Sequence, residues 1–114
     1  MTTFHANGSP MWNLGIAYHP NSQVAWNLGI GYHANSQVAW NLGIAYWPNG
    51  QVAWNLGIAY WENGKVAWNL GTGHHANGSP MGVTDSVELP LGDGIRLVCG
   101  KAGPSLFVYG KQVK

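Results

Sequence analysis

The sequence predicts an all-β fold: an antiparallel β-meander of five 14-residue repeats, followed by a small C-terminal β module. A tryptophan followed by Asn-Leu-Gly recurs every 14 residues, and Asn-Gly or Asn-Ser turn pairs recur with the same spacing. Between these pairs the chain alternates large apolar with small or polar residues, which is the period of a strand. The repeated tryptophans are Trp12, Trp26, Trp40, Trp54 and Trp68.

The turn pairs define the expected strands. Pro48-Asn49-Gly50 is the pattern of a three-residue hairpin loop, with a type I turn and a left-handed glycine at the bulge. Such a loop pairs Trp47 with Gln51, so that even-numbered residues face one another across strands. We therefore expect Val, Trp, Leu, Ile and Tyr of each repeat on one face, and Ala, Asn and Gly on the other. The expected strands span roughly residues 11–19, 23–33, 37–47, 51–61 and 65–75.

A two-sided β-solenoid is the alternative architecture. If Asn27-Leu28-Gly29 is itself a turn, residues 24–26 and 30–32 become two short strands of one coil. The uninterrupted alternation through Leu28 and the hairpin chemistry of the Pro-Asn-Gly loop favour the meander.

The chain divides into two expected parts. Residues 1–81 form the repeat array, which begins and ends with a copy of HANGSPM, at residues 5–11 and 75–81. Residues 82–114 hold seven of the nine charged residues and no copy of the repeat. Gly92-Asp93-Gly94 is expected to join strands at 86–91 and 95–99, with a third strand at 106–109. We interpret this part as a cap or assembly module.

Composition and charge argue against several classes of function and location. The net charge is near zero, so the chain lacks the excess of basic residues expected of a nucleic-acid-binding protein. Asn and Gly interrupt every apolar run, so no membrane span is expected. MTTFHANGSP lacks the features of a secretory signal, and the single cysteine, Cys99, fits a reducing compartment. A cytoplasmic or virion-associated protein is the resulting expectation.

Two stretches carry a resemblance to a known family. At residues 46–54 (YWPNGQVAW) and 60–68 (YWENGKVAW) the chain resembles the MORN-type repeats, particularly the bacterial variant. Over residues 5–78 this resemblance implies a single-layer antiparallel sheet that serves as an interaction scaffold, sometimes for self-assembly, without catalytic residues. MORN repeats are usually longer and richer in charge than this 14-residue unit.

A second resemblance concerns residues 34–46, ANSQVAWNLGIAY, which look like the head repeats of trimeric adhesins and some phage fibres. It implies β-roll coils in a threefold assembly, as in a small virion fibre or adhesin head.

Two columns of side chains are the candidate sites. The aromatic column is a candidate interface or ligand face. Its rings could stack on sugar rings, or they could simply form the apolar core of the sheet. The Asn column is a candidate for hydrogen bonding to a polysaccharide. The alternative is a cross-strand amide network within the sheet. Besides the five tryptophans, the aromatic column contains Tyr18, Tyr32, Tyr46 and Tyr60. The Asn column contains Asn13, Asn27, Asn41, Asn55 and Asn69.

Catalytic and metal chemistry are not expected. The histidines beside the turns are interpreted as exposed strand-end residues, because a metal needs imidazoles that converge within a few ångströms. Cys99 lies in the apolar run IRLVC and is interpreted as a packed thiol. No enzyme activity and no cofactor are therefore expected.

Self-association is the leading functional expectation. Only Glu62 and Lys65 are charged among residues 1–80, and a near-neutral surface favours association. We expect a non-enzymatic structural protein that forms an oligomer or fibre through its apolar Trp face or its sheet edges. The alternatives are a lectin-like carbohydrate-binding module with repeated Trp and Asn sites, and a small trimeric virion fibre or adhesin head.

Overall fold

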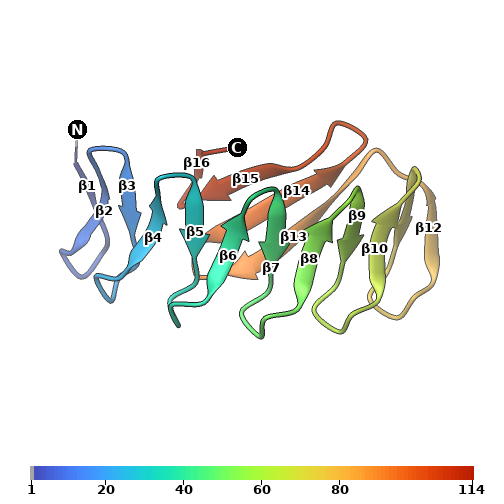
Figure 1. The fold of residues 1–114 in the computed structure, drawn as a ribbon, viewed down its shortest axis with the longest axis horizontal. Coiled ribbons are helices and arrows are strands. Elements are labelled where there is room, and N and C mark those ends of the chain that lie inside the picture. The colour runs from blue at the N-terminus through green and yellow to red at the C-terminus, as the bar shows by residue number, and fades with distance from the viewer. Residues whose placement is uncertain (1) are drawn as a thin grey trace.

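The computed structural model describes residues 2–114 as two antiparallel β-sheets (Figure 1). Strands β1 to β12 form one sheet whose spatial order follows the sequence, and β13 to β16 form a second sheet. The all-β fold, the antiparallel meander and the small C-terminal β module are therefore confirmed. Residues 2–114 include no helix that could cross a membrane.

The strands of the meander are β1 (Thr3–Phe4), β2 (Pro10–Asn13), β3 (Ile16–Tyr18), β4 (Val24–Asn27), β5 (Ile30–Tyr32), β6 (Val38–Asn41), β7 (Ile44–Tyr46), β8 (Val52–Asn55), β9 (Ile58–Tyr60), β10 (Val66–Asn69), β11 (Thr72–His74) and β12 (Pro80–Val83). Those of the second sheet are β13 (Ser86–Gly92), β14 (Ile95–Gly100), β15 (Ser105–Val108) and β16 (Lys111–Gln112). The expected hairpin around Gly92-Asp93-Gly94 is confirmed as β13–β14.

The three-residue loops have the expected hydrogen bonds. The Trp47 amide donates to the Gln51 carbonyl at 2.8 Å, and the Gly50 amide donates to the Trp47 carbonyl at 2.9 Å. Ser22 and Ser36 adopt the same left-handed position with φ of 72°. Serine therefore accepts the bulge position that glycine takes in the other loops.

The prediction of five long strands is wrong, because Asn-Leu-Gly is a turn in every repeat. Leu42 and Gly43 have φ of 51° and 80°, as in a two-residue type I′ hairpin, and Asn41 pairs with Ile44. Each repeat thus contributes two strands of three or four residues. The β-solenoid alternative included this turn, but the solenoid is also wrong. Its coils would stack on one another, whereas the strands here pair antiparallel in chain order within one sheet.

The expected distribution of side chains over the two faces is wrong for the same reason. The two-residue turn places Trp40 opposite Ala45, and a bulge near Ala39 brings Trp40 opposite Gly31 on the other side. Trp therefore shares the inner face with Ala and Gly. Val, Asn, Ile and Tyr lie on the opposite face, here called the outer face, while the turn leucines project from one rim. The outer face consists of Val24, Val38, Val52, Val66, Asn13, Asn27, Asn41, Asn55, Asn69, Ile16, Ile30, Ile44, Ile58, Tyr18, Tyr32, Tyr46 and Tyr60.

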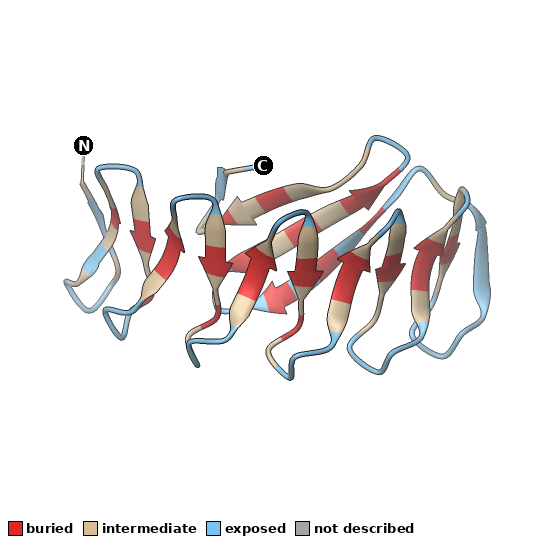
Figure 2. Cartoon of the chain, viewed as in Figure 1, coloured by how far each residue is buried: buried red, intermediate tan, exposed pale blue. Residues whose placement is uncertain are grey.

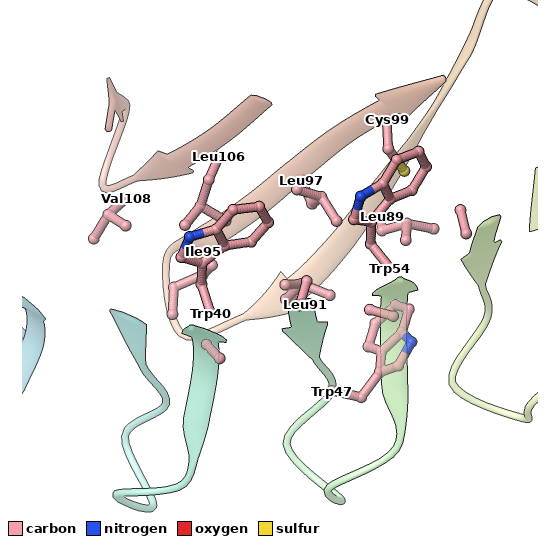
Figure 3. Packing of buried hydrophobic residues seen from close by; sticks show 14 of the residues in the cluster. Trp40, Trp47, Trp54, Leu89, Leu91, Ile95, Leu97, Cys99, Leu106 and Val108 are labelled. Atoms are coloured by element: carbon pink, nitrogen blue, oxygen red, sulfur yellow. The ribbon is translucent and has the colours of Figure 1, made fainter. Parts of the chain in front are cut away.

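The core lies between the two sheets. Figure 2 shows buried residues in the middle of the strands of both sheets and exposed residues in the turns. In Figure 3 the indole rings of Trp40 and Trp54 lie among apolar side chains of the small sheet, including Leu97. Leu89, Leu97 and Leu106 are completely buried. The C-terminal sheet therefore covers the Trp face of the same chain.

The turn leucines give the first testable consequence. Leu42 is 90% exposed in a left-handed conformation that costs an ordinary residue about 1 kcal/mol or more. We expect Leu42→Asn to raise the free energy of unfolding by about 0.5–1 kcal/mol, because asparagine tolerates this conformation. Urea unfolding of dilute protein measures the change. Leu42→Ala, which keeps the backbone penalty, is the control and should change stability little; a destabilised Leu42→Asn variant would contradict this account of the turn.

Candidate functional site

The Trp column is enclosed within the chain. Trp12, Trp26, Trp40, Trp54 and Trp68 are each at most 9% exposed. The indole N–H of Trp12 donates to the Val108 carbonyl at 3.2 Å, and that of Trp68 donates to the Thr84 carbonyl at 2.8 Å. The Lys111 ammonium lies 4.6 Å from the Trp12 ring centroid. These tryptophans are thus held by the C-terminal residues and present no face to a ligand.

A second column of rings lies beside the three-residue loops, all on one rim of the meander. Each ring donates an N–H to the carbonyl oxygen of the residue 13 positions later, which joins one repeat to the next. For the histidines the proton must be on Nε2, because a carbonyl oxygen only accepts. The bonds are His5 to Tyr18 (2.6 Å), His19 to Tyr32 (2.7 Å), His33 to Tyr46 (2.8 Å), Trp47 to Tyr60 (2.9 Å) and Trp61 to His74 (2.8 Å).

The interpretation of the turn histidines as exposed is wrong for His19 and His33, which are completely buried. Both donate a ring N–H to a carbonyl oxygen of the next repeat. The indole N–H of Trp can make the same bond, so Trp replaces His in later repeats. The two histidines also lie on the same rim of the meander, since each repeat is a hairpin. Within residues 2–114 no group of three or more His, Cys, Asp or Glu side chains could hold a metal ion.

The histidine column also binds the C-terminal sheet to the meander. The Tyr109 hydroxyl donates to His19 Nδ1 at 2.7 Å, and the Ala34 amide donates to the Asp93 carboxylate at 3.0 Å. Burial and the nearby Asp93 raise the pKa of Tyr109 to about 12, so its proton stays in place. Asp93 Oδ2 lies 3.8 Å from His33 Nδ1, which is buried and has no hydrogen-bond partner among residues 2–114.

The Asn column lies on the outer face, away from the tryptophans. Asn13 accepts a hydrogen bond from the Thr2 hydroxyl at 3.0 Å. The expected cross-strand amide network is absent from the described residues, since the side chains of Asn27, Asn41, Asn55 and Asn69 make no hydrogen bond there. Across the Leu-Gly turn the first three of these asparagines pair with Ile, as in the Asn41–Ile44 pair.

The Tyr column joins the Asn column rather than the Trp column. Three grooves on the outer face repeat with the 14-residue period, and each is lined by Gln, Val, Asn and Tyr of one repeat. Gln and Val were not predicted as members of this site, and Val was expected on the same face as Trp. The shared lining residues are Gln23, Val24, Asn27 and Tyr32; Gln37, Val38, Asn41 and Tyr46; and Gln51, Val52, Asn55 and Tyr60.

The free edges of the meander form another candidate surface. All four residues of β12 are exposed, with Val83 at 94% and Met81 at 42%. At the other edge, Phe4 in β1 is 59% exposed. Neither strand contains a charged residue. Both edges therefore combine unpaired backbone groups with accessible apolar side chains.

The polar groups of the C-terminal sheet have structural roles. Burial raises the pKa of the Cys99 thiol to about 12, so the thiolate nucleophile is strongly disfavoured. The Glu88 carboxylate accepts a hydrogen bond from Arg96 at 2.7 Å on the surface. Arg96 also lies 4.1 Å from the Phe107 ring centroid.

Comparison of the chain with protein-family models, with curated proteins and with solved structures gives no match.

His33 gives a testable pH dependence. Desolvation lowers its pKa from the ordinary 6.5, so below pH 6.5 the unfolded chain binds more protons than the folded chain. The stability that neutral His33 contributes is therefore present above pH 6.5 and is lost as the pH falls toward the lowered pKa. We expect His33→Gln, which can still donate an N–H to Tyr46, to flatten this dependence.

The measurement is the free energy of unfolding in urea from about pH 7.5 to about pH 5.5. His75→Gln is the control, because His75 is exposed. An equal slope in the wild type and His33→Gln would contradict the assignment of the titration to His33.

Proposed function

We propose that this chain is a non-enzymatic structural β-repeat protein that associates with copies of itself through the edges of its meander. The association route through the Trp face is no longer available, because the C-terminal sheet of the same chain buries that face. In the remaining route, β12 of one copy pairs with β1 of the next.

The observation that carries this proposal is the matching register of β12 and β2, which differ in that Gly82, at the position of Trp12, has a φ of 89°. The β11–β12 pairing repeats the β1–β2 pairing 70 residues later, with the same bulge. β2 has a further neighbour, β3, on its other side, whereas no strand within residues 2–114 pairs with the other side of β12. Pro10 in β2 and Pro80 in β12 are equivalent, so the proline does not prevent such a neighbour. The matching pairs are Thr3↔Trp12 with Gly73↔Gly82, and Phe4↔Pro10 with His74↔Pro80.

Strand direction supports a head-to-tail arrangement. The meander has twelve strands in alternating directions, so β1 and β12 run opposite ways. A second copy related by translation along the sheet would place its β1 antiparallel to β12, and the alternation would continue. Such a contact joins two different surfaces, and without a closing rotation it produces a filament.

The character of the edges supports the same conclusion. Charged side chains are a common protection against edge pairing, and neither edge has one. The MORN-type resemblance of residues 46–54 and 60–68 also supports a scaffold without catalytic residues. The coils required by a trimeric fibre or adhesin head have no counterpart in this antiparallel sheet.

Sedimentation equilibrium combined with negative-stain microscopy tests the proposal. We expect concentration-dependent association and linear particles for the wild type. Val83→Lys should weaken association at least about tenfold, because it puts a charge on the pairing edge, while the 94% exposure of Val83 leaves the fold unaffected.

Gln51→Lys is the matched control, since it adds the same charge in the middle of the array and the next repeat carries Lys65 at that position. It should associate like the wild type. A wild-type chain that stays monomeric at high micromolar concentration would overturn the proposal, as would equal weakening by Val83→Lys and Gln51→Lys.

A further inference from the structure

The three outer-face grooves have unused hydrogen-bonding capacity. In the middle groove, no described residue hydrogen-bonds the Asn41 amide or the Tyr46 hydroxyl, and both side chains are partly exposed. The equivalent groups of the neighbouring grooves are likewise unused by the fold. The grooves are open to solvent and have volumes of 350, 310 and 500 Å³, within the range for small-ligand pockets, about 300–1,000 Å³.

The chemistry of the lining restricts the ligand. Among the residues that the structure describes, none that lines the three grooves is charged, so the grooves offer no counter-ion to a charged partner. Amide and phenol groups both donate and accept hydrogen bonds, as sugar hydroxyls do. The Val side chain and the Tyr ring supply apolar surface for the C–H face of a sugar ring. This combination fits a neutral carbohydrate.

The repetition restricts the ligand further. Equivalent positions in adjacent repeats are two strands apart, about 9.6 Å along the sheet. A ligand that engages successive grooves must itself be straight and periodic on this scale, as an extended chain of β-linked sugars is. Linked weak contacts of this kind increase the overall affinity without any new type of contact.

We propose that the outer face binds an extended, neutral β-linked polysaccharide across the grooves centred on Tyr32, Tyr46 and Tyr60. The polar contacts come from the Asn and Gln amides, and the tyrosine rings carry the sugar faces. The inference is independent of edge pairing, because the grooves face away from the sheet edges. A filament formed through the edges would extend the same track of sites.

Titration calorimetry with cellohexaose, xylohexaose and mannohexaose tests the proposal, with the corresponding disaccharides and the coiled α-linked maltohexaose for comparison. We expect at least one of the three β-linked hexasaccharides to bind at least about tenfold more tightly than its disaccharide and than maltohexaose. Tyr46→Ala should weaken binding about tenfold, and Asn41→Ala about fivefold, because each removes contacts from the middle groove.

Phe107→Ala is the matched aromatic control, since Phe107 lies on the C-terminal sheet, and it should bind normally. Val83→Lys should also bind normally, which separates this proposal from edge association. Absence of binding by all three hexasaccharides at millimolar concentration would overturn the inference, and so would equal loss in Tyr46→Ala and Phe107→Ala. If Tyr46→Ala instead dissolves a dimer that Val83→Lys leaves intact, a second copy occupies the face and the inference is also overturned.

Discussion

Two turns of different length, used in strict alternation, decide where every side chain of the repeat points. The Leu-Gly turn reverses the chain with two residues, while the loop at residues 48–50 uses three and adds a bulge. Together they return each tryptophan to the same face of the sheet. Loss of one residue from either turn would exchange the faces of the strands that follow. The core, the outer face and both rims depend on this alternation.

The C-terminal sheet completes a structure that the repeats alone leave open. A single-layer sheet has no second layer to bury its apolar face, and here β13–β16 supply that layer over the tryptophans (Figures 1 and 3). Hydrogen bonds from Tyr109 to His19 and from Ala34 to Asp93 fix the position of that layer. The outer face and the two edges remain accessible, so the functional proposals concern those surfaces.

The sequence allowed prediction of the repeats, the three-residue loops, the antiparallel meander and the β13–β14 hairpin, because each has local turn chemistry. It did not allow the faces to be assigned. Leucine at a left-handed position is unusual, so Leu42 was expected inside a strand, and that single error moved Trp and Tyr to the same side. The burial of His19 and His33 depends on Tyr109 and Asp93, which are distant in sequence and leave no local signal.

The structure has one arrangement on which the rest depends: the tryptophans are buried within the single chain, while the outer-face tyrosines stay accessible. Trp emission and its quenching by acrylamide, measured on protein dilute enough to be monomeric, test it most directly. Six of the seven tryptophans are buried, so we expect blue-shifted, weakly quenched emission together with ready nitration of the outer-face tyrosines by tetranitromethane. Red-shifted, freely quenched emission from the monomer, with tyrosines protected from nitration, would contradict the account.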